Sequence, residues 1–217
     1  LCAEWGIPVT VERQAVGERC AQRGWSLEDG ARRIRYDFLL RVAHAHSAGA
    51  VALAHTADDQ AETVLMRLIR GTGLLGLGAI PVKRQLDGVW LVRPLLEVWR
   101  RDILAYLRQE RVGYREDPTN ADPRFVRNRI RHELLPLLER GYNPQVKGAL
   151  TQLAEQSQVD YAFLREAAAR QWKRTVKVER SDTTILLRHL LKQPPALQRQ
   201  LVREAQNNSL VDMAGNV

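Results

Sequence analysis

The chain has 217 residues, of which 45% are hydrophobic and 27% are charged, the ordinary balance of a globular protein that can bury a core. No apolar run approaches the roughly 20 residues that cross a bilayer, and two cysteines outside any Cys-x-x-Cys pair argue against disulfide, zinc or iron–sulfur sites, which fits a reducing cytoplasm. Lysine and arginine number 33 against 25 aspartates and glutamates, and this net charge of +8 favours a polyanionic partner, although a basic protein with solvated arginines has the same balance.

The first half of the chain predicts alternating strands and helices. Strands are expected at Ile7–Glu12, at the apolar run Ala48–Ala54, which should be buried on both faces of a sheet, and at Trp90–Val92. Helices are expected after Ser26, which is placed as an N-cap, and from Thr56, where apolar residues recur at helical spacing. This order predicts an α/β fold with a partial Rossmann-like parallel sheet.

Two stretches of the first half refine this pattern. The helix after Thr56 should bury one stripe, and the run Gly71–Gly78 is too rich in glycine to continue that helix. The residues of the expected stripe are Ala61, Val64, Leu65, Leu68 and Ile69.

After the sheet, the composition predicts mainly helices. The expected segments are a helix Val98–Glu110, a capped helix start at Asp122-Pro123, a break at Pro136, a long helix from Asn143-Pro144, a hairpin Thr175–Arg188 that turns at Ser181-Asp182, and a helix after Pro195. We therefore expect residues 1–95 to form a partial α/β domain, residues 96–172 a helical subdomain with a linker helix, and residues 173–217 the start of a small C-terminal domain.

The segment His55–Thr63, HTADDQAET, places a histidine and three carboxylates where a strand ends and a helix begins. Ligands bind at that edge of open α/β sheets. Asp58 and Glu62 lie one turn apart, with Asp59 on the same side. Carboxylates this close repel one another, so something must favour their ionised forms, and a magnesium ion is the natural candidate. Simple capping is the alternative, because acids are stabilised in a first helical turn.

A second informative stretch is Asp122–His132, DPRFVRNRIRH, with four arginines. Arg124, Arg127 and Arg131 fall on one helical side. The planar guanidinium suits phosphate, so this side is a candidate for binding phosphate or RNA. A solvated basic face with local salt bridges is the alternative.

Several segments, taken together and in order, resemble the tRNA(Ile)-lysidine synthetase family of the N-type ATP pyrophosphatase (PP-loop) group. They are Ser26–Tyr36 (SLEDGARRIRY), His55–Thr63 (HTADDQAET), Leu68–Leu77 (LIRGTGLLGL), Arg93–Leu96 (RPLL), Glu116–Asn120 (EDPTN) and Arg127–Pro136 (RNRIRHELLP). The resemblance covers roughly residues 1–170, and the ordered set is far more specific than any single motif.

The resemblance implies a cytoplasmic ligase that uses ATP and magnesium to adenylate carbon 2 of the wobble cytidine in a tRNA(Ile) with a CAU anticodon. The side-chain amine of free L-lysine then displaces AMP and leaves lysidine. Adenylation turns a poor leaving oxygen into a good one, and the enzyme must hold ATP, base and amine together. A homodimer is a further candidate assembly.

The resemblance also implies roles for single residues. Asp58, Asp59 and Glu62 would bind magnesium or orient or deprotonate the amine, with Asp58 and Glu62 as the metal ligands, and His55 would lie near the cytidine or the adenylate. The residues expected to contact phosphate, developing charge or the tRNA backbone are Arg32, Arg70, Arg127, Asn128 and Arg131. Of these, Arg70 is expected to take part in catalysis, with His55, Asp58 and Glu62.

The chain departs from the family pattern at both ends. The family's ATP loop, SGGxDS, is absent before the first helix, and the last residues, NNSLVDMAGNV, match nothing expected. We therefore expect residue 1 not to be the native start and the chain as given not to adenylate RNA by itself. The alternatives are a PP-loop tRNA thiolase, whose relatives typically use cysteine pairs or an iron–sulfur cluster, and a tRNA-binding paralogue without catalysis.

Overall fold

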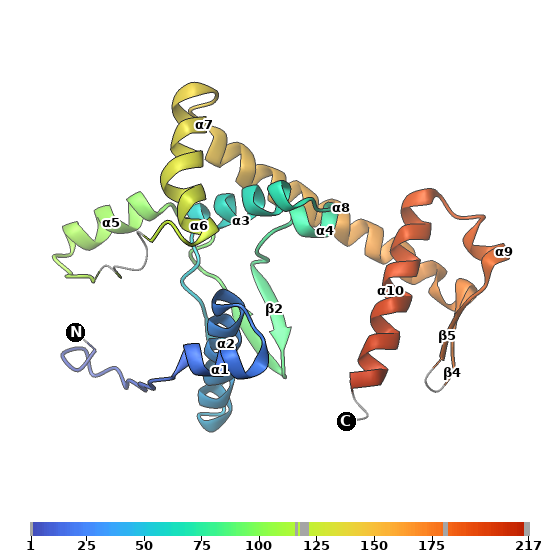
Figure 1. Ribbon diagram of the computed structural model, residues 1–217, viewed down its shortest axis with the longest axis horizontal. Helices are drawn as coiled ribbons and strands as arrows, with labels where there is room; N and C mark the ends of the chain where they lie inside the picture. The colour runs from blue at the N-terminus through green and yellow to red at the C-terminus, as the bar shows by residue number, and fades with distance from the viewer. Residues whose placement is uncertain (1, 116, 118–121, 180–181, 215–217) are drawn as a thin grey trace. The chain divides into compact units, whose positions relative to one another are not determined.

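The computed structural model describes residues 2–115, 117, 122–179 and 182–214 and has a mixed α/β fold, as expected from the sequence (Figure 1). The chain packs as two compact units. The first unit comprises residues 1–57 and 81–112, and the second comprises residues 58–80 and 113–217. The domain division at residues 95/96 and 172/173 stays a prediction. No helix within the described ranges is both long and apolar enough to cross a bilayer.

The first unit combines helices with a small sheet of order β1-β3-β2. Strand β1 runs parallel to β3, as expected, while β2 runs antiparallel to β3. The elements of this unit are α1 (Val16–Arg23), α2 (Leu27–Ala45), β1 (Ala50–Ala52), β2 (Lys83–Leu86), β3 (Val89–Val92) and α5 (Arg100–Gln109).

Strand β1 is an edge strand, which corrects the prediction of a strand buried on both faces. Ala50 and Ala52 are exposed and Val51 is half-buried. Among the described residues, β1 pairs with β3 alone. The burial of a strand's side chains depends on what covers the two faces of the sheet, which the apolar composition of the run does not report.

The antiparallel hairpin β2–β3 was not predicted. Its turn is Asp87-Gly88, with φ of 48° and 77°, the two positive values that a type I′ hairpin turn requires. The Asp-Gly pair is the local signal that would have found it. In β3 the side chains alternate, with Val89 and Leu91 buried and Trp90 exposed.

Local capping positions α1 against α2. Gly24 ends α1 in the left-handed conformation at φ 64°. Ser26 caps α2 as predicted, because its side chain accepts a hydrogen bond from the N–H of Asp29 at 3.2 Å. The helices approach so closely at Gly30 that any side chain there would collide with Sγ of Cys20.

The N-terminal segment corrects two further predictions. Ile7–Glu12 forms no strand (Figure 1), and its apolar residues Ile7, Val9 and Val11 are exposed. A strand is stabilised by hydrogen bonds to a neighbouring strand, and no described strand pairs with this segment. Before it lies a turn, in which Trp5 N–H donates to the carbonyl of Cys2 at 3.2 Å, although the sequence Leu1–Trp5 followed by Gly6 predicts the end of a helix.

The second unit is mostly helical, and its long helix α8 joins two clusters of buried residues. Its elements are α3 (Ala57–Arg70), α4 (Leu74–Leu77), α6 (Val126–Arg129), the π-helical segment η2 (Ile130–Leu134), α7 (Leu135–Gly141), α8 (Val146–Thr175), β4 (Val176–Glu179), β5 (Asp182–Ile185), α9 (Leu187–Leu190) and α10 (Pro195–Ala214).

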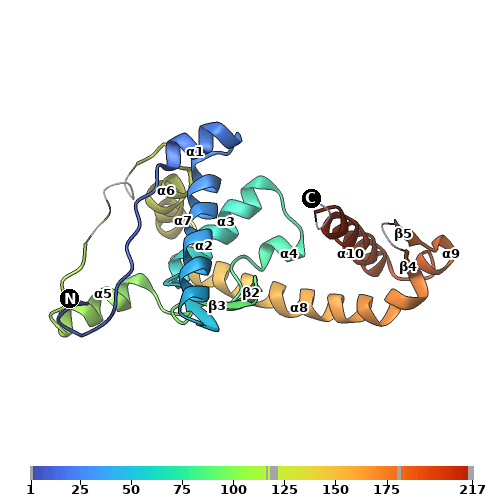
Figure 2. The ribbon, with the colours of Figure 1, turned by 90° about the horizontal axis from the view of Figure 1, so that it is seen from below.

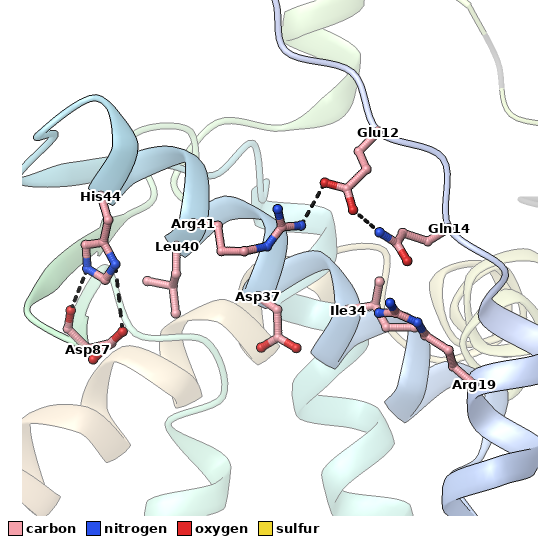
Figure 3. A pocket seen from close by; sticks show the side chains of 9 residues that line it. All are labelled: Glu12, Gln14, Arg19, Ile34, Asp37, Leu40, Arg41, His44 and Asp87. Carbon is pink, nitrogen blue, oxygen red and sulfur yellow. Dashed lines mark hydrogen bonds and ion pairs between the residues drawn. The ribbon is translucent and has the colours of Figure 1, made fainter.

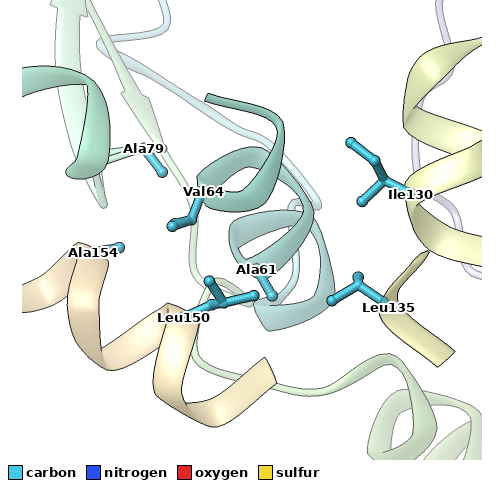
Figure 4. Close-up of a cluster of buried hydrophobic side chains, with 7 residues drawn as sticks. All are labelled: Ala61, Val64, Ala79, Ile130, Leu135, Leu150 and Ala154. Atoms are coloured by element: carbon cyan, nitrogen blue, oxygen red, sulfur yellow. The ribbon is translucent and has the colours of Figure 1, made fainter. Parts of the chain in front are cut away.

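The main core of this unit lies where α3, the α6–α7 region and α8 meet (Figure 4). Ala61 and Val64 of α3 are fully buried there, as expected from their spacing. Leu68 and Ile69 of the same predicted stripe are instead 43% and 60% exposed. Their spacing matches the stripe, but they lie in the last turns of α3, beyond the residues that pack in this core.

The helix expected after the cap at Asp122-Pro123 changes its hydrogen bonding just before Pro136 and continues through this residue, where a break was predicted. It starts at Val126 rather than at Pro123, turns π-helical over Ile130–Leu134, and continues as α7 from Leu135. Proline at position 136 has no N–H to donate to the preceding turn, and a π-helical turn upstream absorbs the irregularity.

The far end of α8 carries the predicted hairpin and the last helix (Figure 2). Strands β4 and β5 pair antiparallel, and the predicted turn residue Ser181 lies outside the described residues. Ala168 of α8 is buried against Leu190 and Leu201. The hairpin, α9 and α10 therefore pack on α8 through a core of their own.

Candidate active site

The start of α3 carries the acidic residues that the sequence analysis singled out. Asp58 and Asp59 lie in the first helical turn, where the helix dipole stabilises negative charge. Glu62 follows three residues after Asp59, so both carboxylates project from one side of the helix. Local sequence therefore determines their shared direction, while their partners come from residues about 65 positions further along the chain.

Glu62 is bound by two arginines. Arg131 donates from Nε to Oε1 at 2.6 Å and from Nη2 to Oε2 at 2.9 Å, the two-pronged contact that a guanidinium makes with a carboxylate. Arg127 donates from Nε to Oε2 at 2.9 Å. The Glu62 side chain is only 2% exposed, so these contacts compensate the burial of its charge.

Asp59 joins the same two arginines. Its Oδ1 accepts from Nη2 of Arg127 at 3.1 Å and from Nη2 of Arg131 at 3.4 Å. Two carboxylates and two guanidiniums thus form a neutral group, which we call the arginine–carboxylate cluster: Asp59, Glu62, Arg127 and Arg131. The third arginine on the predicted face, Arg124, instead pairs with Asp122 at 2.7 Å.

The surroundings of Arg131 favour the charged form of its guanidinium. The hydrogen bond to Glu62 raises the pKa of Arg131 above its usual value, while burial acts in the opposite direction. The negative charges of Glu62, Asp59 and Asp58 raise this pKa further. Repulsion among the three acids had suggested a magnesium ion, but for Asp59 and Glu62 the arginines supply the positive charge.

Asp58 has a different cationic neighbour. Nζ of Lys147, at the start of α8, lies 3.5 Å from Oδ1 of Asp58 and 3.5 Å from Oε1 of Glu139 in α7. Neither Lys147 nor Glu139 was expected at the site. Their spacing from Asp58 is set by how three helices pack, so no local pattern could have indicated them.

The cluster does not fit a magnesium site by itself. Both oxygens of Glu62 already accept hydrogen bonds from arginines, although magnesium would need them as ligands. Among the described residues, no group of three or more His, Cys, Asp or Glu side chains is placed to hold a metal ion.

The remaining predicted site residues lie elsewhere. Arg70 is exposed at the end of α3, eight residues beyond Glu62 and so about 12 Å along the helix. Asn128 is buried, and its side-chain N–H donates to the carbonyl of Asp122 at 2.8 Å. His55 and Arg32 belong to the first unit, where His55 is half-buried and Arg32 is exposed.

A pocket of about 630 Å³ in the first unit is not lined by any predicted site residue (Figure 3). Several of its polar groups are paired with one another. Arg41 lies 2.7 Å from Glu12, and Nε2 of His44 lies 3.1 Å from the carbonyl of Asp87. The arginine–carboxylate cluster with Asp58 is therefore the stronger candidate for an active site.

Comparison with known proteins gives the context for this site. Residues 1–138 match the PP-loop domain family. The chain is similar to proteins named tRNA(Ile)-lysidine synthase from Symbiobacterium thermophilum (43% identity, 94% of this chain and 44% of the relative) and Geobacter sulfurreducens (42%, 94% and 43%). It is likewise similar to that from Geobacillus kaustophilus (39%, 83% and 39%). The chain thus spans less than half the length of these relatives.

One solved structure is also similar, the U34-tRNA thiolase NcsA from Methanococcus maripaludis with its [4Fe-4S] cluster. The identity is 21% and the TM-score 0.48, over 71% of this chain and 52% of that one.

Proposed function

This chain belongs to the PP-loop domain family, and we propose that its protein is an ATP-dependent ligase that forms lysidine in tRNA(Ile) with a CAU anticodon, in the cytoplasm. The oxygen on carbon 2 of the wobble cytidine attacks the α-phosphate of ATP, and pyrophosphate leaves. The side-chain amine of free L-lysine then attacks carbon 2. AMP departs with that oxygen, and the amine loses a proton.

The observation that carries this proposal is the pair of arginines held on Glu62. Each has one nitrogen, Nη1, that donates no hydrogen bond within the described part of the chain. The side chains of Arg127 and Arg131 are 32% and 28% exposed. Their free donors suit the phosphates of ATP or the pyrophosphate that leaves, and Glu62 and Asp59 orient them before the substrate arrives.

Asp58 is the carboxylate that we assign to the amine. Its neighbour is already an ammonium group, that of Lys147 at 3.5 Å, so the position accepts a positively charged nitrogen. A carboxylate there can orient the incoming lysine amine and take its proton.

Magnesium is proposed as a companion of ATP. Magnesium bound to nucleotides takes much of its coordination from phosphate oxygens and water. Asp58 is then the protein carboxylate that would complete it, because both oxygens of Glu62 are engaged by arginines. We assign the metal no separate step.

The other predicted residues keep narrower roles. His55 precedes Asp58 by three residues and is proposed to lie near the cytidine or the adenylate. Arg32 and Arg70 are proposed contacts for phosphate or developing charge. Asn128, which is bound to the carbonyl of Asp122, is proposed to stabilise the turn that presents Arg127.

The test is an assay of lysidine formation with the protein at its full native length. Tritiated lysine, ATP and a tRNA(Ile) transcript with a CAU anticodon should give labelled tRNA and AMP. Asp58→Asn should lower the rate by roughly 100-fold or more, as expected for loss of a general base. Asp102→Asn is the matched control, since Asp102 is exposed on α5 and pairs with Arg101.

The outcomes separate the alternatives. No lysine-dependent product from the wild-type protein would refute the ligase, and a product that needs a sulfur donor would indicate a thiolase. Binding of tRNA without any product would indicate a paralogue without catalysis. A normal rate for Asp58→Asn in an active protein would overturn the role of Asp58 alone. A homodimer is also proposed, and light scattering after size-exclusion chromatography tests it.

A further inference from the structure

The first unit carries a group of arginines that stack on aromatic rings. The Trp25 ring has the guanidinium carbon of Arg33 at 5.0 Å and that of Arg23 at 5.5 Å from its centroid. The ring of Tyr36 likewise has Arg84 at 5.1 Å and Arg32 at 5.5 Å. These distances are those of cation–π contacts. We call the six residues the arginine–aromatic face.

Helix α2, the end of α1 with the turn after it, and strand β2 supply the residues of this face. Arg32 and Tyr36 lie four residues apart on α2, so they share one helical side. Trp25 stands between the left-handed end of α1 at Gly24 and the N-cap of α2. Strand β2 supplies Arg84 from across the sheet, and Trp25, Tyr36 and Arg84 line one pocket of about 440 Å³.

Most of these guanidiniums have no acidic partner. Within the described residues, Arg23, Arg32 and Arg84 contact rings but form no hydrogen bond or ion pair with a carboxylate. Nε of Arg84 is buried without a hydrogen-bond partner, so the ring of Tyr36 holds this side chain. Arg33 differs, because it pairs with Asp29 at 2.9 Å.

The charge of the face stays positive after its acids are counted. Asp29 and Asp37 line the pocket together with Arg32, Arg33 and Arg84, so three arginines face two carboxylates there. An arginine over a ring keeps N–H donors that the ring does not use. The donors of Arg23, Arg32 and Arg84 form no hydrogen bond within the described residues, and guanidinium donors suit the non-bridging oxygens of phosphates.

We propose that the arginine–aromatic face binds the phosphate backbone of RNA. This inference rests on the proposed function in one respect, which is that the RNA is a tRNA. Contacts to phosphate oxygens carry no sequence information, so binding at this face should not depend on the sequence of the RNA. An acidic protein partner would present carboxylates to the same forks and is an outcome of the test.

The experiment measures tRNA binding against salt concentration for the protein at its full native length. The double variant Arg23→Gln/Arg84→Gln should bind tRNA roughly tenfold more weakly at physiological salt, with the slope of log K against log salt smaller by about 1.5, because each lost phosphate contact removes about 0.7–0.9. The loss should be equal for tRNA(Ile) and an unrelated tRNA. Arg23→Gln alone, at an exposed position, should show about half of the slope change.

Controls and contrary outcomes make the test decisive. Arg101→Gln, on α5 of the same unit, removes one exposed arginine outside the face and should leave the slope unchanged. Circular dichroism establishes folding of each variant, and the single variant tests the proposal if the double variant is unstable. Wild-type slope and affinity in a folded Arg23→Gln variant overturn the proposal, as does loss of binding to an acidic protein without loss of tRNA binding.

Failure of the proposed function has a different signature. If the wild-type protein makes no lysidine but Arg23→Gln reduces the slope of log K against log salt, the ligase proposal fails and the RNA-binding face stands. If the wild-type protein makes lysidine and the KM for tRNA is unchanged in Arg23→Gln, the ligase proposal stands and the RNA-binding face fails.

Discussion

Arg131 in the second unit donates two hydrogen bonds to the buried carboxylate of Glu62, whereas Arg32 in the first unit lies over the ring of Tyr36 and contacts no described carboxylate. The first arginine is fixed by charge and the second by a polarised ring. A buried ion pair stabilises only while both partners are present, because each desolvated charge alone is costly. A stacked arginine keeps its hydrogen-bond donors available.

The two groups therefore differ in what they can bind. In the arginine–carboxylate cluster most donors are used internally, and little is left for a ligand beyond the outward Nη1 groups. On the arginine–aromatic face Arg33 donates to Asp29, while Arg23, Arg32 and Arg84 donate no hydrogen bond within the described residues. The first arrangement suits a small, precisely held anion, and the second suits an extended polyanion.

The largest expected effect comes from removing the carboxylate that holds the cluster. Glu62→Gln leaves two guanidiniums facing one aspartate in a buried site, and the free energy of unfolding should fall by about 3–5 kcal/mol. Urea unfolding measures it. Glu166→Gln, which removes the exposed partner of Arg170, is the matched control and should change stability by less than about 0.5 kcal/mol. Equal effects of the two variants would show that the cluster is not a buried network.

A second comparison replaces an arginine by lysine in each group. Arg131→Lys keeps the charge but loses the two-pronged contact with Glu62, which should lower stability by about 1.5–3 kcal/mol. Arg23→Lys, at an exposed and stacked position, should change it by no more than about 0.5 kcal/mol. Thermal unfolding of both variants checks this. If Arg131→Lys is neutral, charge alone rather than geometry holds the cluster.

The next effect concerns the ring beneath two arginines. Trp25→Leu removes the cation–π contacts of Arg23 and Arg33, each about 0.5–1 kcal/mol, so the free energy of unfolding should fall by about 1–2 kcal/mol. Binding of tRNA should weaken a few-fold as the guanidiniums lose their orientation. Trp5→Leu removes an exposed ring without such a contact and serves as the control. Should Trp25→Leu bind tRNA like the wild type, orientation by stacking contributes nothing to binding.

The smallest effect belongs to an exposed pair close in sequence to the cluster. Hydrogen bonds from Arg124 hold the pKa of the Asp122 carboxyl below its usual value. Because this pKa is lower in the folded state, the pair makes a small contribution to the free energy of unfolding. That contribution is present above the ordinary pKa of aspartate and is lost as the pH falls through the lowered pKa of Asp122. Carbon-detected NMR titration measures this pKa, and Arg124→Gln should return it toward the ordinary range. An unchanged pKa in that variant would contradict the assignment.

The sequence by itself determined the local elements. Ser26 as the cap of α2, the helix after Thr56, the π-helical irregularity before Pro136 and the parallel pairing of two apolar runs follow from capping, periodicity and proline geometry. The cap, the helix and the irregularity depend on residues within a few positions of one another, whereas the parallel pairing joins Ala50–Ala52 to Val89–Val92 and was inferred from the order of the elements. The Asp-Gly turn of β2–β3 is an equally local signal, so this hairpin could have been predicted from the sequence, although it was not.

Only the tertiary structure decided which residues meet. The sequence placed Asp58, Asp59 and Glu62 together at the start of α3, but their counter-charges come from distant helices. Periodicity also could not show that β1 is an edge strand or that Leu68 and Ile69 lie beyond the core. Burial and ion pairing depend on which neighbours arrive from far along the chain, and that information is not contained in the spacing of residues on one helix or strand.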